Sequence, residues 1–193
     1  MINRVRDITV ACFLTLLSSP LWVVTVLAIL AESKGNPFYL SPRIGLHGKQ
    51  FRMLKFRTMF RDGDLRLNKL EHDELQSNFK ITNDPRVTGV GRWLRRYSLD
   101  ELPQLVNVVK GDMTLVGPRP KLPQEIELYG PSKEELLSVL PGMTGYWQIH
   151  RTTANSDTAM REMDLYYVRH KCLGLDAMLL LQTIKVVFSR VNY

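Results

Sequence analysis

An uncharged apolar run near the N-terminus constrains this chain more than any other feature of its sequence. The run extends from Ile8 to Ala31, 24 residues without a charged side chain. A helix needs ~20 apolar residues to cross a bilayer core of about 30 Å, whereas the apolar core of a cleaved signal peptide is normally about 7 to 15 residues long. The run therefore predicts a membrane anchor rather than a signal peptide.

Two features predict that this anchor turns back instead of crossing the membrane. Ser19 and Pro20 lie in the middle of the run, where a proline removes a backbone donor and bends the helix. Each arm would be about 18 Å long, short of a full crossing. Lys and Arg flank the run on both sides, so the positive-inside rule places both flanks in the cytoplasm. We expect a re-entrant helix-break-helix hairpin over residues 1–34, broken at Ser19 and Pro20; a single spanning helix is the alternative.

The remaining residues, 35–193, are long enough for one domain with its own core. The whole chain of 193 residues holds 26 Lys and Arg against 19 Asp and Glu, a formal charge of +7. This charge suits the phosphates of lipids, nucleotides and nucleic acids equally well, and so names no partner. Cys12 and Cys172 are the only cysteines, which excludes a disulfide framework and a zinc site of clustered thiolates.

A basic pair follows the anchor, in the segment Phe51–Met59. Alternation with a period of two predicts an extended segment with Lys55 and Arg57 on one face. Two neighbouring cations suit an anionic ligand, and a solvated basic strand near acidic lipid is the alternative. Residues 61–83 are polar and only loosely amphipathic, so we expect a surface helix or cover there.

Pro103 locates a helix N-terminus. Proline is tolerated only in the first turn of a helix, so the helix that follows should begin between residues 99 and 102. Asp100 and Glu101 then lie where unpaired amides and the positive end of the helix dipole favour an anion, either these carboxylates or a bound phosphate. Ser98 and Glu101 also match a capping box, which is a purely structural alternative.

Two further segments are candidates for ligand or membrane contact. Arg119 lies between two prolines in Gly117–Pro120, where few backbone conformers are lost when the guanidinium binds a phosphate; a rigid loop with an incidental arginine is the alternative. Gly174–Phe188 predicts an apolar helix with Asp176 in its first turn, too short to span and so either buried or interfacial. Turns are expected within residues 141–145.

In their order along the chain, these motifs resemble the bacterial sugar transferase family, the monotopic phosphoglycosyl transferases that begin capsule, exopolysaccharide, O-antigen or glycoprotein glycan assembly. The resemblance covers nearly the whole chain. Each motif alone is weak, whereas the ordered set is highly specific. The motifs are Arg4-x-x-Asp7, Ser19-Pro20, Lys55-Phe-Arg-Thr-Met59, Asp84-Pro-Arg-Val-Thr88, Ser98-Leu-Asp-Glu-Leu-Pro-Gln-Leu105, Asn107, Lys110-Gly-Asp-Met113, Val116-Gly-Pro-Arg-Pro120, Pro141-Gly-Met-Thr-Gly145, Trp147-Gln148 and Asp164-Leu-Tyr-Tyr167.

The resemblance implies a covalent two-step mechanism with Asp100 and Glu101 as the catalytic pair. Asp100 would attack the sugar-bearing phosphorus of a nucleotide diphosphate sugar and release the nucleoside monophosphate, and polyprenyl phosphate would then displace the aspartate. Glu101 would hold Mg²⁺. The family further implies roles in substrate or phosphate binding for Lys55, Arg57, Arg119, Arg151 and Asp176. The chain departs from the family before Arg151, because many members follow Trp-Gln with Asn-Gly-Arg or Ser-Gly-Arg, where this chain has the shorter Ile149-His150-Arg151.

The family fold implies an α/β body, rich in helices with a small sheet, on the cytoplasmic face of the bacterial inner membrane. It would be monotopic, held by the hairpin and by interfacial amphipathic helices. The expected partners are a nucleotide-sugar donor, with uridine the preferred base, polyprenyl (undecaprenyl) phosphate and membrane lipid, and no nucleic acid. A non-enzymatic alternative is a basic, membrane-tethered module that binds acidic lipid or nucleic acid. An enzymatic alternative is a polyprenyl-linked glycosyltransferase that moves sugar without phosphate.

Overall fold

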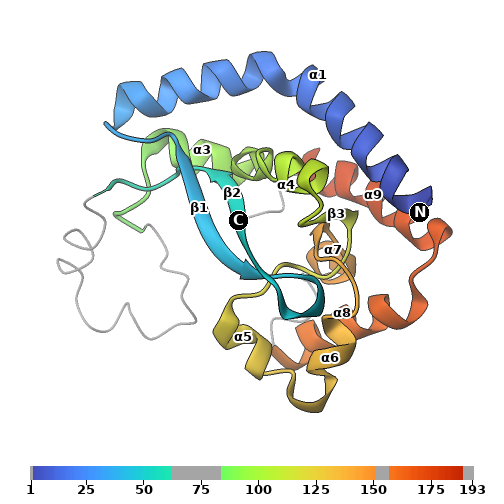
Figure 1. The fold of residues 1–193 in the computed structure, drawn as a ribbon. Helices are drawn as coiled ribbons and strands as arrows, with labels where there is room; N and C mark the ends of the chain where they lie inside the picture. The colour runs from blue at the N-terminus through green and yellow to red at the C-terminus, as the bar shows by residue number, and fades with distance from the viewer. Residues whose placement is uncertain (1, 62–83, 151–156, 189–193) are drawn as a thin grey trace.

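The structure is a computed structural model that describes residues 2–61, 84–150 and 157–188. Helices dominate it, and the described strands form two separate two-stranded sheets. Figure 1 shows the long helix α1 (Ile2–Glu32) along one edge of the molecule, with the other elements beneath it. The helix-rich body with little sheet agrees with the predicted fold class, although the sheet is divided into two pairs.

Helix α1 is bent but not broken. It is one α-helix with Pro20 inside it, and Figure 1 shows it as an arch. Pro20 cannot donate a hydrogen bond to the carbonyl of Leu16, and the hydroxyl of Ser19 bonds that carbonyl instead, at 2.8 Å. The hydroxyl of Ser18 bonds the carbonyl of Leu14 in the same way, at 2.7 Å. The expected bend is therefore present, whereas the expected break is not, and the hydroxyl of Ser19 bonds the one carbonyl that Pro20 leaves without a backbone donor.

Both ends of α1 are tied to the body. Near the N-terminal end, Arg4 donates to two carbonyls at the C-terminal end of α4 (Gln104–Lys110), 2.6 and 3.0 Å away. At the C-terminal end, the carboxylate of Glu32 accepts hydrogen bonds from the first two amides of α3 (Gly89–Arg96), at 2.6 and 2.8 Å. The arch thus bridges two helices that follow one another in the chain.

The two sides of α1 differ in environment. Ala11, Thr25 and Ile29 are buried against the body. By length and composition, residues Arg4–Glu32 could cross a membrane. The side that faces away from the body is a continuous exposed apolar surface, made of Phe13, Leu16, Leu17, Val23, Val24 and Leu27.

Strands β1 (Phe38–Ile44) and β2 (Gln50–Phe56) form an antiparallel hairpin, with the short 3-10 turn η1 (Leu46–Gly48) between them. Phe51 and Met53 are buried on the face of β2 that also carries Lys55. The predicted extended segment is therefore confirmed as far as Phe56, whereas Phe56 is buried on the opposite face and Arg57 lies beyond the strand. Asn107 of α4 bonds the backbone of β2 twice, accepting from the amide of Leu54 and donating to the carbonyl of Arg52, both at 2.9 Å. These bonds fix α4 to the strand that carries Lys55.

Helix α3, a 3-10 turn η3 (Leu99–Glu101) and α4 follow one another closely. The hydroxyl of Thr88 caps α3 by accepting from the amide of Gly91 at 2.8 Å. Pro103 directly precedes α4 as its N-cap, so α4 begins at Gln104, two residues after the predicted range of 99–102. Gly111 ends α4 with a φ of 98°, a left-handed conformation that glycine adopts without strain. Instead of one helix that begins between residues 99 and 102, the structure has the 3-10 turn η3 followed by α4.

A short parallel pair, β3 (Thr114–Val116) and β4 (Gly142–Thr144), holds the middle of the body. The turns predicted at residues 141–145 are wrong for residues 142–144, which pair with β3 instead. Gly142 permits this, because a Cβ there would lie 2.1 Å from the amide nitrogen of Gly117. Between the two strands lie α5 (Pro123–Glu127), η4 (Gly130–Ser132) and α6 (Lys133–Leu136).

Helices α7 (Tyr146–His150), α8 (Asp157–His170) and α9 (Leu173–Phe188) complete the described fold. The C-terminal helix predicted from residue 174 to 188 is confirmed to within one residue. Leu179 of α9 is buried in the core, whereas Leu181 and Ile184 are exposed. Helix α9 is therefore neither fully buried nor fully exposed, and its outer side is apolar.

Candidate active site

Asp100 and Glu101 lie in η3, between α3 and α4. Ser98 precedes them with a left-handed φ of 53°, and its side chain makes no capping hydrogen bond to η3. The carboxylate of Glu101 instead accepts from Nζ of Lys55, 2.6 Å away, and Oδ2 of Asp100 lies 4.0 Å from the same nitrogen. The capping-box alternative is therefore not what the structure adopts. Three predicted site residues, from β2 and η3, come together here.

Asp100 is the more buried of the two carboxylates. Its side chain is 13% exposed, against 41% for Glu101. Burial raises the pKa of Asp100 above its ordinary value, and the neighbouring Glu101 adds to the rise, whereas Lys55 and Arg95 oppose it. Asp100 is thus a poorly hydrated carboxylate with two cations close enough to favour its charged form.

The turn that carries the two acids rests on an apolar cluster shared with α1. Leu99 and Leu102, which flank the acids, pack with Phe56 of β2 and Leu94 of α3. Ile29 of α1 is buried in the same cluster. The positions of the acids are therefore set by β2, α3 and α1 together.

Arg57 lies two residues beyond Lys55, but its guanidinium points elsewhere. Nη2 donates to the carbonyl of Ser33 at 2.7 Å and Nη1 to the carbonyl of Lys34 at 2.9 Å. These carbonyls belong to the two residues that follow α1. The structure thus gives Arg57 a bonding role just beyond the end of α1, and its predicted phosphate contact stays a prediction.

A second pair of cations, Arg119 and Arg43, was only half expected. The guanidinium carbon of Arg119 lies 5.8 Å from the ring centroid of Trp147. Burial lowers the pKa of Arg43 of β1, and the nearby charge of Arg119 lowers it further. The side chain of Arg43 is 11% exposed, its bond to Glu125 is 3.6 Å long, and its buried Nε has no hydrogen-bond partner among the described residues. Sequence analysis missed Arg43, because it reads only as one of many basic residues after the apolar run.

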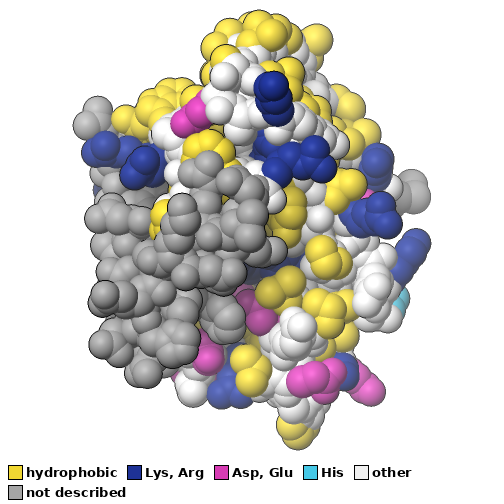
Figure 2. All heavy atoms as spheres, turned by 90° about the vertical axis from the view of Figure 1, so that its left-hand side faces the viewer, with side chains coloured by type: hydrophobic (Ala, Val, Ile, Leu, Met, Phe, Trp, Pro, Cys, Tyr) yellow, Lys and Arg dark blue, Asp and Glu magenta, His cyan; other side chains and the backbone are white. Residues whose placement is uncertain are grey.

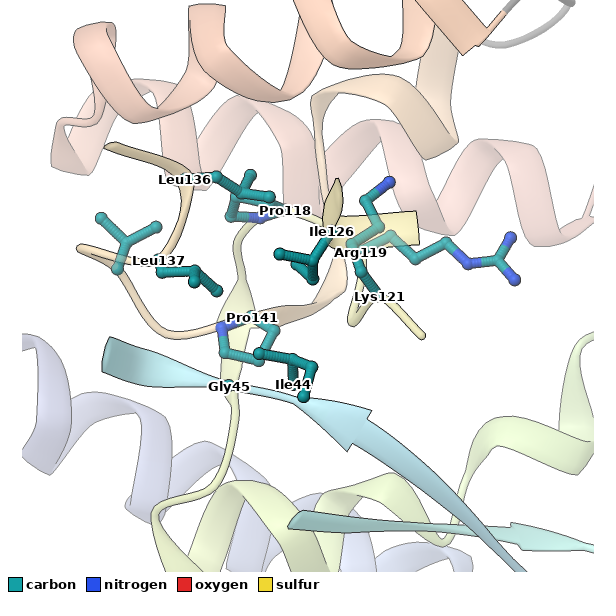
Figure 3. A pocket seen from close by; sticks show the side chains of 10 residues that line it. Ile44, Gly45, Pro118, Arg119, Lys121, Ile126, Leu136, Leu137 and Pro141 are labelled. Carbon is teal, nitrogen blue, oxygen red and sulfur yellow. The ribbon is translucent and has the colours of Figure 1, made fainter. Parts of the chain in front are cut away.

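Behind the Arg119 loop lie a buried ion pair and a small cavity. Nζ of Lys121 lies 2.8 Å from Oδ2 of Asp164, and both side chains are at most 2% exposed. The cavity is lined mainly by apolar side chains and holds about 10 Å³, room for a single water. Figure 3 shows the guanidinium of Arg119 directed away from the other lining residues. The cavity is therefore too small for a nucleotide sugar, and the guanidinium of Arg119 does not point into it.

Asp176 lies apart from the acids of η3, in a buried network at the N-terminal end of α1. It accepts from Arg6 at 3.1 Å and from the hydroxyl of Tyr167 at 2.7 Å. Arg6 also bonds Asp7 at 2.8 Å, and Asp7 accepts from the hydroxyl of Thr114. These contacts join α1, α8, α9 and β3. They indicate a structural role, and the predicted role of Asp176 in substrate binding remains a prediction.

Two further expectations concern groups that the structure does not place. Arg151 lies outside the described residues, as do residues 62–83 of the surface helix or cover predicted for residues 61–83. Within the described part of the chain, no three His, Cys, Asp or Glu side chains form a group that could hold a metal ion. Mg²⁺, however, is commonly bound by one or two carboxylates together with substrate phosphates, and Asp100 and Glu101 fit that arrangement.

The apolar surface of α1 adjoins basic residues. Figure 2 shows hydrophobic side chains gathered where α1 lies, with Lys and Arg side chains close below them. Lys34 and the α3 residues Arg92 and Arg96 are exposed, as is Trp93 between them. An apolar surface bordered by cations and an indole ring is typical of a protein side that meets lipid headgroups.

Comparison with known proteins gives consistent matches over the chain. The model of the family described as bacterial sugar transferase matches residues 1–190. The exopolysaccharide production protein ExoY of Rhizobium meliloti is 40% identical, over 100% of this chain and 88% of its own length. The undecaprenyl-phosphate galactose phosphotransferase of Salmonella typhimurium is 39% identical, over 98% of this chain and 41% of its own length. The undecaprenyl-phosphate glucose phosphotransferase of Komagataeibacter xylinus is 38% identical, over 97% of this chain and 36% of its own length.

Proposed function

Because the chain belongs to the bacterial sugar transferase family, we propose that it transfers a sugar phosphate from a nucleotide diphosphate sugar to polyprenyl phosphate. The names of two relatives specify undecaprenyl phosphate as acceptor and galactose or glucose phosphate as the group transferred. The same acceptor is proposed here, with a UDP-sugar as donor. This reaction would begin the assembly of a polysaccharide or glycoconjugate at the membrane.

The proposed reaction has two displacements at phosphorus. In the first, a carboxylate oxygen of Asp100 forms a bond to the sugar-bearing phosphorus, and the bond from that phosphorus to the bridging oxygen breaks, so that the electron pair leaves with the nucleoside monophosphate. In the second, an oxygen of polyprenyl phosphate attacks the same phosphorus and the aspartyl bond breaks. The products are nucleoside monophosphate and polyprenyl diphosphate sugar, and Asp100 is regenerated.

The burial of Asp100 beside a lysine is the observation that carries this proposal. A nucleophilic carboxylate must be ionised, and Lys55 at 4.0 Å together with Arg95 favours that form against the effect of burial. The same low hydration makes the carboxylate a better nucleophile than one in water, because fewer water molecules must be displaced. Glu101 is more exposed and is already paired with a cation, Lys55. Asp100 is therefore assigned as the nucleophile and Glu101 as the acid that holds a cation.

Mg²⁺ is proposed as the cation of this site. Glu101 would hold it, with phosphate oxygens of the donor as further ligands. When bound, Mg²⁺ supplies neutralisation of the negative charge that develops on the leaving phosphate. Lys55 and Arg119 are proposed phosphate ligands, and Arg43 joins them because it lies beside Arg119 with an unbonded Nε.

We also propose that α1 enters and leaves the membrane on the same, cytoplasmic side. Arg4 and Glu32 bond to adjacent helices of one body, and a crossing helix would place these partners on opposite sides of the bilayer. The arch and the outward apolar side of α1 support entry to partial depth. The basic residues near both ends favour the cytoplasmic side.

Release of nucleoside monophosphate is the test of this function. Protein in lipid nanodiscs, with Mg²⁺ and undecaprenyl phosphate, is supplied with a panel of UDP-sugars. We expect UMP release from one donor by the wild type. The control Glu127→Gln changes an exposed acid that is paired with Lys133 and should also release UMP. We expect none from Asp100→Asn. Without acceptor, mass spectrometry should find a phosphosugar on the peptide that contains Asp100.

Each alternative has its own outcome in this assay. Release of UDP instead of UMP would favour a glycosyltransferase that moves sugar without phosphate. Full activity of Asp100→Asn would remove Asp100 from the role of nucleophile. No release from any donor, with tight binding to acidic lipid, would favour the non-enzymatic module.

A further inference from the structure

The last residue of the membrane helix holds the first turn of α3. Oε1 of Glu32 accepts from the amide of Gly89 at 2.6 Å, and Oε2 accepts from the amide of Val90 at 2.8 Å. The first amides of a helix have no partner within it, and the positive end of the dipole favours a carboxylate. A Cβ at Gly89 would lie 3.0 Å from Oε1, a tight contact that glycine avoids. Glu32 is thus bound to α3 by two charge-assisted hydrogen bonds.

Helix α3 passes this constraint on to the acids. Its first turn is pressed against the segment after β2, because a Cβ at Gly91 would lie 2.1 Å from the carbonyl oxygen of Thr58. Its last turn is held there too, since Nε of Arg95 donates to the hydroxyl of Thr58 at 2.9 Å. Asp100 follows the end of α3 by only four residues. The short connection therefore leaves few backbone torsions that could absorb a shift of α3 before it moves Asp100.

The same end of α1 also holds the strand that carries Lys55. Arg57, two residues beyond Lys55, bonds the carbonyls of Ser33 and Lys34. The end of α1 thus lies between the two elements that bring Asp100 and Lys55 together. Ile29, one helical turn earlier, packs in the cluster that supports η3.

We propose that Glu32 is a positioning residue for sugar-phosphate transfer, which sets the place of Asp100 relative to Lys55 by fixing α3 to the membrane helix. The proposal rests on the proposed function for the role of Asp100. The structural coupling of Glu32 to α3 and the acids does not depend on that function. It makes the seating of α1 in lipid a condition for the geometry of the acids. Glu32 itself touches no reacting atom.

Three variants test this role. Glu32→Ala removes both hydrogen bonds, Glu32→Gln keeps the size of the side chain and one acceptor oxygen, and Glu127→Ala removes an exposed acid from a surface ion pair as a matched control. Initial rates give kcat and KM for the donor in nanodiscs. Hydrogen–deuterium exchange of residues 89–101 and the melting temperature are measured on the same samples.

We expect Glu32→Ala to lower kcat about tenfold, because small misplacements of a reacting group are costly, while KM stays within about twofold. Glu32→Gln should recover part of the loss, and Glu127→Ala should resemble the wild type. Exchange should quicken in residues 89–101 of Glu32→Ala alone.

Two results would overturn the proposal. One is wild-type kcat in Glu32→Ala. The other is a loss of kcat that follows a lowered melting temperature, with equal effects of Ala and Gln and with exchange quickened throughout the chain. If the wild type itself turns over no donor, the proposed function fails, and exchange alone decides the coupling. Unchanged exchange in residues 89–101 of Glu32→Ala then rejects it, and faster exchange confined to those residues supports it.

Discussion

The buried ion pair of Lys121 and Asp164 allows a stability prediction with a definite sign. The two charges lie 2.8 Å apart and are 2% and 1% exposed. The hydroxyl of Tyr129 donates to the same carboxylate oxygen at 2.7 Å, and both burial and Asp164 raise the pKa of that tyrosine, which keeps it protonated. Removal of one charge leaves the other buried and uncompensated. Such a loss costs about 3–5 kcal/mol, whereas replacement of both charges by uncharged groups is often neutral.

A double-mutant cycle measures this difference. The single variants are Lys121→Met and Asp164→Asn, and the double variant combines them; Asn still accepts from Tyr129. A chain of this size shifts by roughly 2–4 °C in melting temperature per kcal/mol, so each single variant should melt about 6–20 °C below the wild type. The double variant should lose much less in melting temperature than the two single variants lose together, because no charge is left unpaired.

Thermal unfolding in one detergent at one scan rate is the assay, with Lys133→Met as control, since Lys133 forms an exposed pair with Glu127. Exposed pairs contribute about 0–1 kcal/mol, so the control should melt within a few degrees of the wild type. Additive losses in the double variant would refute the reasoning, as would single variants that melt like the control. The ion pair would then be effectively hydrated in solution.

Two further predictions concern the acids and the membrane helix. Burial raises the pKa of Asp100, and the attacking carboxylate must be ionised, so the rate should fall with decreasing pH at a higher pH than a free aspartate would give. In Lys55→Met this acidic limb should move further up, and a pH–rate profile with an unmoved limb would contradict the assigned contact. For the helix, single cysteines replacing the exposed Val5 and Lys34, in a chain with Cys12→Ser and Cys172→Ser, should both react with an impermeant maleimide from the cytoplasmic side only. Labelling from opposite sides would establish a spanning helix.

Local patterns were sufficient to predict several elements. The alternation in Phe51–Met59 predicted an extended segment that carries Lys55, and β2 covers this segment as far as Phe56. Pro103 located the start of α4 to within two residues, since proline is excluded from a helix interior. The apolar run of residues 174–188 predicted α9. Each of these depends on neighbours within a few residues.

Contacts between distant segments could not be predicted in this way. The bonds from Arg57 to Ser33 and Lys34 depend on where α1 ends in space, and no spacing in the sequence announces them. Arg43 and Arg119 are brought together only by tertiary structure. The strand at residues 142–144 is too short for a period of two to be recognised, and its Pro-Gly start favoured turns. At Pro20, the predicted bend is present, but the predicted break is wrong, because the helix continues through the proline.

The two feet of the α1 arch differ in when their partners are synthesised. Glu32 bonds amides that lie 57 and 58 residues further along the chain, whereas Arg6 bonds Asp176, 170 residues further along. Arg4, in the same N-terminal foot, bonds the carbonyls of Val108 and Val109, 104 and 105 residues further along. Chains grow at roughly 5–20 residues per second, so the partners of Glu32 are synthesised first, those of Arg4 follow, and Asp176 comes roughly 10 to 30 s after Arg6. The C-terminal foot of the arch can therefore form first, and the N-terminal foot is complete only when α9 has been synthesised.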